Sequence, residues 1–170
     1  MFKQILVPID GSDCSLHALE VAAAFAKEQQ ARLNVCTVVD PAKAAAMAFG
    51  EASMAAACLD ALDEEGKALV EDAAARVRPI WPADVTVLDG APADAIVQYA
   101  HESGADLIII GSHGRSGLPR LFLGSVAEGV IRNAAAPVMV VRQVPAAAEA
   151  PAKERTAKAA IEGAKAPAGA

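Results

Sequence analysis

A chain of 170 residues has the length of a single domain and is long enough to bury a hydrophobic core. Its composition is 54% hydrophobic but only 4% aromatic, which favours alanine-rich helices packed on a sheet over a β-sandwich. The formal net charge of −6 argues against a nucleic-acid-binding surface, because phosphate contacts require clustered Lys and Arg.

The cysteines and the hydropathy indicate the compartment. Cys14, Cys36 and Cys58 form neither a CxxC pair nor a Cys/His ligand pattern, so we expect free thiols in a reducing compartment and no metal site. No apolar stretch reaches 18 residues without a charge, and the N-terminal apolar run is too short for a signal peptide. We therefore expect a cytoplasmic protein without a membrane span.

Strands are expected at five short runs, residues 5–9, 33–39, 85–88, 107–110 and 138–141. Each run is mostly apolar and lacks regular alternation with polar residues, which is typical of strands covered on both faces of a parallel sheet. A run of this length is also compatible with a buried helix, but the β-branched residues favour strands.

Helical patterns separate these runs. Apolar residues at three-four spacing predict helices over residues 16–27 and 55–78, and Pro79 ends the second. Pro92 is placed to begin a third helix that Gly104 closes, and residues 125–128 (SVAE) match a capping box that opens a fourth. Strands that alternate with helices predict a three-layer, doubly wound α/β domain with a five-stranded parallel sheet.

Two segments fall outside this pattern. Residues 41–53, rich in Ala with Met47, Phe49 and Gly50, are expected to form a long connection before the second helix. From residue 144 onward the chain is nearly all Ala, Pro, Lys, Glu and Gly, which cannot bury enough apolar surface to offset the entropy of ordering. We therefore expect one domain over residues 1–143 and a disordered tail over residues 144–170.

Residues suited to ligand binding follow the first and fourth strands. In open α/β sheets ligands bind beyond the carboxyl ends of the strands, where the winding direction reverses. The first strand is followed by Asp10, and the fourth by a glycine-rich loop that leads to Gly124 at the start of a helix. Glycines let backbone N–H groups approach a ligand, and a helix N-terminus attracts anions. The loop is neither a P-loop nor a GxGxxG motif.

Several of these residues also have simpler interpretations. Asp10 could cap the first helix or bond its own turn, and Ser125 could serve only the capping box. His113 lacks an evident carboxylate partner, so a loop role is favoured over acid–base catalysis. Arg115 and Arg120 are candidates either for phosphate contacts or for ordinary solvated charges.

The loop spacing resembles a known signature. Gly111, two residues, Gly114, nine residues and then Gly124 and Ser125 match the G-2x-G-9x-G-(S/T) pattern of the ATP-binding branch of the universal stress protein family. Residues 3–12 (KQILVPIDGS) are similar to that family's first strand and loop. The resemblance covers residues 2 to 142.

This resemblance implies a sheet order of 3-2-1-4-5 and an ATP site with Asp10 at the adenine or ribose, Val38 beside the base, and the helix start at the phosphates. Family members often hold a divalent ion, Mg²⁺ or Mn²⁺, with the phosphates, and commonly form homodimers through the last strand, here Val138 to Val141. The implied nucleotide-binding residues are Pro8, Ile9, Asp10, Val38, Gly111, His113, Gly114, Arg115, Gly124, Ser125 and Val126.

The function predicted is that of an ATP-binding stress-response regulator in which the loop over residues 112–123 orders on binding. The sequence supplies no clear catalytic base, so at most weak ATP hydrolysis is expected and no other enzymatic activity. Two alternatives stay open. One is a nucleotide-free dimeric interaction module, and the other is an enzyme related to nucleotidyl transferases or flavoproteins, although the HxGH and SGGxDS loops of the former are missing.

Overall fold

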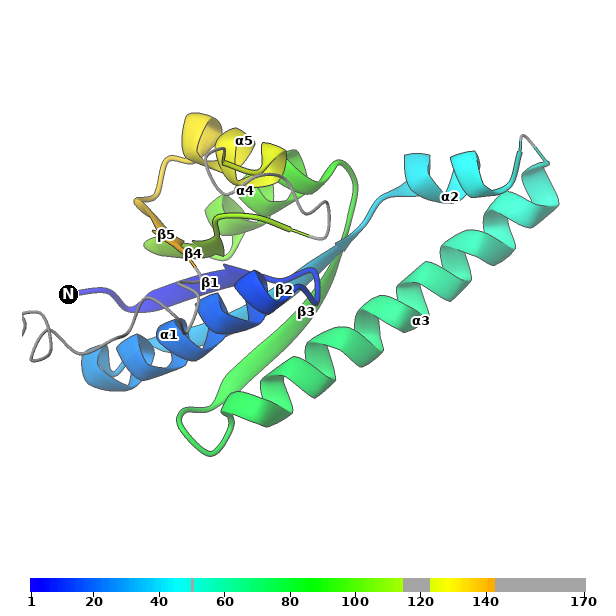
Figure 1. Cartoon of the computed structure of the whole chain (residues 1–170). Helices are drawn as coiled ribbons and strands as arrows, with labels where there is room; N and C mark the ends of the chain where they lie inside the picture. The colour runs from blue at the N-terminus through cyan, green and yellow to red at the C-terminus, as the bar shows by residue number, and fades with distance from the viewer. Residues whose placement is uncertain (50, 115–122, 143–170) are drawn as a thin grey trace, which may run out of the picture.

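A parallel sheet forms the centre of the protein. The computed structural model describes residues 1–49, 51–114 and 123–142. The strand order is β3-β2-β1-β4-β5 and every neighbouring pair is parallel (Figure 1). The five predicted strands and their order are thereby confirmed. They are β1 (Gln4–Pro8), β2 (Arg32–Val39), β3 (Ala83–Asp89), β4 (Leu107–Gly111) and β5 (Val138–Val141).

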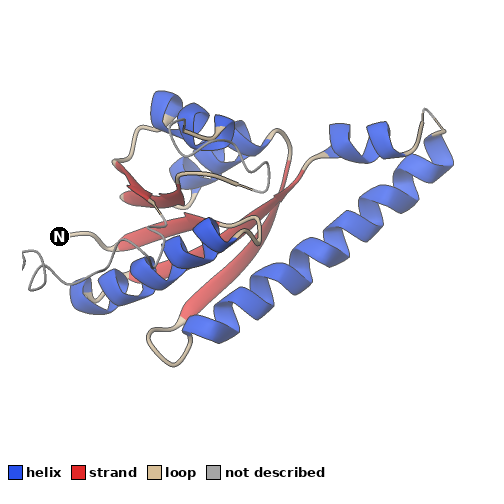
Figure 2. Cartoon of the chain, viewed as in Figure 1, coloured by secondary structure: helices blue, strands red, loops and turns tan. Residues whose placement is uncertain are grey.

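Helices cover both faces of the sheet, which gives the three layers predicted (Figure 2). In the described residues these are α1 (Asp13–Gln29), α2 (Pro41–Met47), α3 (Ala52–Val77), α4 (Pro92–Glu102) and α5 (Ser125–Asn133). Buried residues of α1 and α3 pack on one face, and those of α4 and α5 pack on the other. The fold is therefore a doubly wound α/β domain.

The two cores explain why the strand sequences do not alternate. Ile5 and Val7 of β1 point into the core beneath α1 and α3, whereas Leu6 points into the core beneath α4 and α5. Successive side chains of a strand lie on opposite faces, so a strand covered on both faces needs apolar residues at every position. The same holds in β4, where Ile108 and Ile109 belong to different cores.

The connection expected over residues 41–53 is wrong, because most of it is helical. Asp40 caps α2 by accepting the backbone N–H of Ala42 at 2.9 Å, and Pro41 occupies the first helical position. Asp before Pro is a helix-start signal, and the alanines that follow have the highest helix propensity. After a short turn α3 begins at Ala52, three residues earlier than the predicted start at residue 55.

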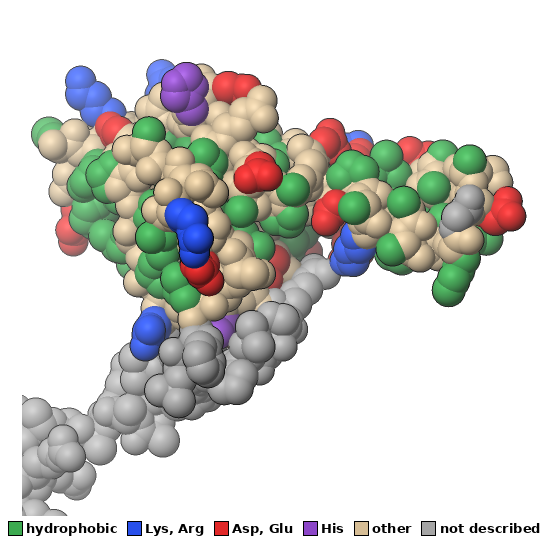
Figure 3. Space-filling model, turned by 90° about the horizontal axis from the view of Figure 1, so that it is seen from above, with side chains coloured by type: hydrophobic (Ala, Val, Ile, Leu, Met, Phe, Trp, Pro, Cys, Tyr) green, Lys and Arg blue, Asp and Glu red, His purple; other side chains and the backbone are tan. Residues whose placement is uncertain are grey.

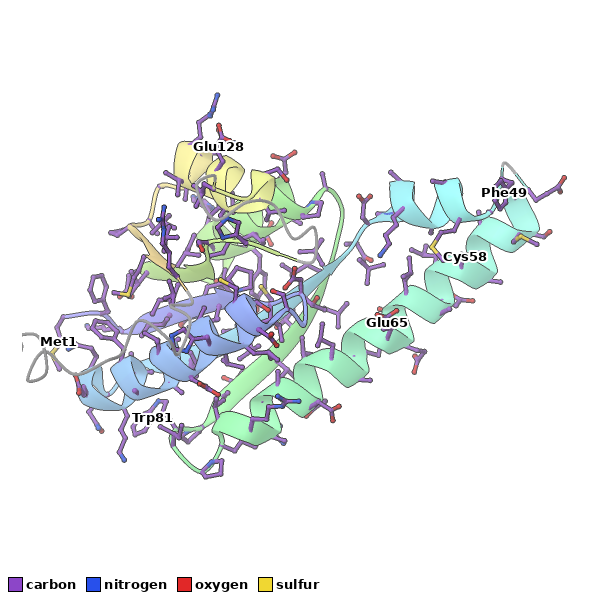
Figure 4. All side chains as sticks on the ribbon, viewed as in Figure 1. Met1, Phe49, Cys58, Glu65, Trp81 and Glu128 are labelled. Atoms are coloured by element: carbon purple, nitrogen blue, oxygen red, sulfur yellow. The ribbon has the colours of Figure 1, made fainter. Side chains whose placement is uncertain are left out.

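The helices α2 and α3 form a hairpin that extends beyond the sheet (Figures 1 and 3). None of residues 52–65 of α3 is buried. Packing on the sheet begins at Gly66, where a Cβ would lie 3.2 Å from Thr37 Cγ2. At the far end, Phe49 is 94% exposed, and Met47 and Met54 are about half exposed (Figure 4).

The other helices lie where predicted, with α1 beginning three residues earlier and ending two residues later than the predicted range 16–27. Pro92 begins α4, and Gly104 follows its C-terminal residue with a φ of +70°, in the left-handed conformation that glycine favours. The capping box predicted at Ser125 is wrong. Gly124 is the N-cap of α5, so Ser125 is already helical, and the Glu128 carboxylate pairs with Arg132 at 2.6 Å.

Cys14, Cys36 and Cys58 form no disulfide with one another. Cys36 lies on β2 and is fully buried, and this burial raises the pKa of its thiol to about 12. Because the thiolate is the reactive form, Cys36 is an inert part of the core.

Candidate functional site

A cavity lies where the winding of the sheet reverses. The strands β1 and β4 are neighbours, and the chain leaves the carboxyl end of β1 toward β2 but that of β4 toward β5. The loops therefore diverge and leave a hollow between them. Its volume is about 270 Å³, and the ends of β1, β2 and β4 and the starts of α4 and α5 line it.

Every residue of the predicted set that the structure describes lines this one cavity. From β1 and the loop after it come Pro8, Ile9 and Asp10; from β2, Val38; from the loop after β4, Gly111, His113 and Gly114; and from the start of α5, Gly124, Ser125 and Val126. Arg115 lies outside the described residues, as do Arg120 and most of the loop expected to order on binding.

Six further lining residues escaped the sequence interpretation. Pro92 and Ile96 stand one turn apart on α4, so they face the cavity together. The sequence predicts Pro92 only as the start of a helix. Like Asp10, however, Pro92 follows the carboxyl end of a strand, and this position could have marked it as a candidate site residue. The others are Ser15, Thr37, Ile110 and Ala127.

The Asp10 carboxylate is held by the turn that precedes α1. Ser12 donates to Asp10 Oδ1 twice, from its backbone N–H at 3.0 Å and from its hydroxyl at 2.6 Å. Ser12, not Asp10, is the N-cap of α1, and its Oγ accepts the backbone N–H of Ser15 at 3.3 Å. The local role proposed for Asp10 is therefore only half right: it bonds its own turn but does not cap the helix.

Asp10 also faces the glycine-rich loop across the cavity. A Cβ built on Gly114 would lie 2.5 Å from Asp10 Oδ2, closer than two such atoms can approach. Glycine is thus required at residue 114 because the carboxylate occupies the place of a side chain. The loop after β1 and the loop after β4 meet at this contact.

The start of α5 presents backbone N–H groups at the other end of the cavity. The N–H of Gly124 donates to the backbone carbonyl of Ser112 at 2.9 Å, which fixes the loop to the helix start. Within the described part of the chain no side chain caps α5, and the first residues of the helix, Ser125 to Ala127, line the cavity. The first N–H groups of a helix have no partner within it and carry a partial positive charge, so this end is suited to an anion.

His113 brings an imidazole to the same wall. Its Nδ1 lies 2.9 Å from the Ser112 hydroxyl. Its Nε2 is buried and has no hydrogen-bond partner in the part of the chain that the structure describes. Cys14 lies behind this wall, with Sγ 3.5 Å from the Val141 carbonyl, and does not line the cavity. That position favours a structural thiol.

A second hollow of about 210 Å³ adjoins the first and shares Asp10, Thr37, Val38 and Pro92 with it. It extends beneath the hairpin, where Asp40 and Lys43 of the α2 end and Glu65 of α3 line it. The first cavity, at the switch point where the winding of the sheet reverses between β1 and β4, thus opens toward the base of the hairpin.

Residues 1–49, 51–114 and 123–142 contain neither a metal-binding cluster nor a membrane-spanning helix. No cluster of three or more His, Cys, Asp or Glu side chains could hold a metal ion there. None of the helices in these ranges is both long and apolar enough to cross a membrane.

The fold and the cavity define a class: a doubly wound α/β protein with a glycine-lined pocket at its switch point. The model of the universal stress protein family matches residues 1–142. The chain is 38% identical over 149 residues to Universal stress protein MJ0531 of Methanocaldococcus jannaschii, which covers 84% of each chain. This protein belongs to the universal stress protein family.

Solved structures agree with this assignment. The structure of MJ0577, also from M. jannaschii, has a TM-score of 0.75 with 29% identity, covering 86% of this chain and 99% of that one. A universal stress protein in complex with cAMP has a TM-score of 0.60 with 29% identity, covering 83% of this chain and 97% of that one. The resemblance drawn from the glycine spacing is thereby confirmed.

Proposed function

We propose that this protein binds an adenine nucleotide, ATP, in the cavity at the switch point and acts as a cytoplasmic, nucleotide-dependent regulator of the stress response. One observation carries the proposal: an apolar wall, the Asp10 carboxylate and the uncapped N-terminus of α5 line a single cavity. A base, a ribose and a phosphate chain need these three surfaces in this order. The relative crystallised with cAMP supports a nucleotide in this family.

The proposed roles follow from the position of each residue. Val38 and Ile96 supply apolar surface for the base, and Asp10 accepts hydrogen bonds from ribose hydroxyls. The N–H groups at the start of α5 bind the phosphates. Since the described residues hold no metal cluster of their own, Mg²⁺ or Mn²⁺ would arrive with the phosphates, as Mg²⁺ usually does. Slow hydrolysis of ATP remains part of this proposal.

The proposal is tested by identifying any nucleotide released from the denatured protein and by titrating the emptied protein with ATP in a calorimeter. We expect a dissociation constant in the micromolar range, which corresponds to a binding free energy of about −8 kcal/mol. Replacing Gly124 with Leu is expected to lower it at least about tenfold, because a Cβ there already lies 3.3 Å from the Ser112 carbonyl and the longer side chain must enter the phosphate end.

The matched control is Ala91→Leu at the N-cap of α4, which is exposed and outside the cavity. Both caps have an extended backbone that leucine tolerates, so both variants should fold. Folded wild-type protein that releases no nucleotide and gives no heat with ATP would refute the proposal and favour a nucleotide-free interaction module.

We further propose that the protein forms a homodimer through β5. This strand is an edge of the sheet, and its residues Val138 to Val140 are only partly buried. The carbonyls of Pro137 and Val141 accept from β4, so the N–H groups of the alternate residues Val138 and Val140 point away from it. An apolar edge strand with outward-pointing backbone donors favours pairing with another strand.

A Val140→Pro variant is therefore expected to be monomeric and folded, because it removes an outward N–H but no bond to β4. Analytical ultracentrifugation measures the mass. The control is Met139→Pro, which removes a backbone N–H directed toward β4. We therefore expect this variant to be less stable than the wild type. A Val140→Pro protein that is still dimeric would place the interface elsewhere.

A further inference from the structure

Ser112 is a buried residue that the site assignment left without a role. It follows β4, is 1% exposed and does not line the cavity. Its backbone N–H donates to the Val141 carbonyl at 2.8 Å, and its own carbonyl accepts from Gly124. Its hydroxyl lies 2.9 Å from His113 Nδ1 and 3.6 Å from Cys14 Sγ. Two backbone hydrogen bonds and the contacts of its hydroxyl thus hold Ser112 in place, so it can set the orientation of the His113 imidazole.

The direction of the Ser112–His113 hydrogen bond follows from the neighbouring thiol. The Cys14 thiol donates to the Val141 carbonyl at 3.5 Å, and a carbonyl can only accept. The thiol proton is therefore engaged, and the Ser112 hydroxyl has two acceptors in reach: His113 Nδ1 and the more distant sulfur. Nitrogen at the shorter distance is much the better acceptor. This arrangement favours donation from the Ser112 hydroxyl to His113 Nδ1.

A neutral imidazole that accepts at Nδ1 carries its proton on Nε2. His113 Nε2 is buried and lacks a partner in the described part of the chain, on a residue that lines the cavity, so in this tautomer it is a donor without an acceptor. A buried donor without an acceptor is costly, and native proteins rarely retain one without a reason. An acceptor brought by the ligand would satisfy it.

We propose that Ser112 is a positioning residue that holds His113 as a neutral Nε2–H donor to an oxygen of the ribose–phosphate part of the nucleotide. The inference rests on the proposed function and assigns the hydrogen-bonding role that the site lacked. It has a chemical consequence. With Nδ1 bonded to Ser112 and a proton on Nε2, His113 has no lone pair to accept a proton from water, so it binds the nucleotide and does not act as a general base.

The first test needs no nucleotide. The ¹⁵N chemical shifts of the imidazole nitrogens report which one carries the proton, and His101, which is exposed, provides an internal comparison. We expect His113 to be the Nε2–H tautomer in the wild-type protein and a mixture of tautomers in Ser112→Ala. The Nδ1–H tautomer in the wild type would overturn the proposal, whether or not the protein binds nucleotides.

The second test uses two amide substitutions. The glutamine amide reaches the place of ring Nε2, and the asparagine amide only that of Nδ1. We expect His113→Asn to weaken AMP binding about tenfold and His113→Gln to keep it within about threefold, measured by calorimetry. Equal losses in both variants, or a loss in neither, would overturn the donor role.

Adenosine separates the two sources of the oxygen. If His113→Asn weakens AMP but not adenosine, the acceptor is a phosphate oxygen; if it weakens both, the acceptor belongs to the ribose. Either result supports the donor role. A wild-type protein that binds neither compound refutes the nucleotide function itself, and the tautomer measurement then still decides the role of Ser112.

Discussion

A Gly114→Ala variant is expected to lose about tenfold or more of its affinity for ATP while its fold is retained. The added Cβ would lie 2.5 Å from Asp10 Oδ2, so the carboxylate must rotate away. The two hydrogen bonds from Ser12 to Asp10 oppose this rotation. The substitution therefore removes the proposed ribose acceptor without altering Asp10 itself.

Calorimetric titration with ATP measures the effect, and Gly104→Ala is the matched control. Gly104 follows α4 with a φ of +70°, and a Cβ there would meet nothing within 4 Å. Alanine at residue 104 should cost about 1 kcal/mol of stability through its backbone conformation and leave ATP affinity unchanged. If Gly114→Ala binds ATP as the wild type does, Asp10 does not face the nucleotide.

A Gly111→Ala variant is expected to lose about 1–3 kcal/mol of the free energy of unfolding. A Cβ on this last residue of β4 would lie 3.1 Å from backbone atoms of Cys14 and Ser15 in the first turn of α1. A side chain could rotate away, but a helix backbone cannot, so the helix and the strand must separate. Nucleotide affinity should fall as well, because both elements line the cavity.

Urea unfolding provides the measurement, with Ile110→Val as the comparison. That substitution removes one methyl group from the neighbouring buried residue and adds no contact, so we expect a loss of about 0.5–1.5 kcal/mol. A Gly111→Ala protein as stable as the wild type would mean that α1 can move away from β4 at no cost.

The sequence predicts the strands well because the sheet is buried on both faces. Burial of Leu6 in one core and of Ile5 and Val7 in the other leaves no place for a polar side chain over residues 5–7, so this apolar run is easily recognised in the sequence. Helix signals such as Pro92 are equally local. The order of the strands in the sheet depends instead on contacts between segments that are far apart in the sequence. It was predicted through the resemblance to a family and not from the spacing of the residues.

The errors have physical reasons too. The segment after β2 contains Met47 and Phe49, which are exposed and so do not follow an amphipathic pattern, although Asp40 and Pro41 signal a helix start. Ser125 matched a capping box, but the N-cap is set by where the loop joins α5, through the Gly124–Ser112 hydrogen bond. Periodicity in one sequence cannot predict such contacts between separate loops.

The role of Ser112 was hidden for a similar reason. A serine beside a histidine is common in a sequence and predicts no special role. The role proposed for Ser112 depends on its contacts with Cys14 on α1 and Val141 on β5, which only the fold brings together. The candidate site was therefore predicted as a set of loop residues at one sheet edge, but the contacts that orient those residues were not.

The α2–α3 hairpin gives the protein two levels of local stability. None of residues 52–65 is fully buried, although Cys58, Leu59 and Leu62 are partly so. The second half of α3 instead packs on the sheet through Val70, Ala73 and Val77. Opening of the hairpin exposes the small buried side chains of Ala44 and Ala48 but no large one, so its amides should exchange with solvent faster than those of residues 66–77. The cavity walls come from β1, β2, β4, α4 and α5, and none of its lining residues belongs to the hairpin. The hairpin can therefore unfold and refold, or be cut by a protease near the exposed Phe49, while these walls stay intact.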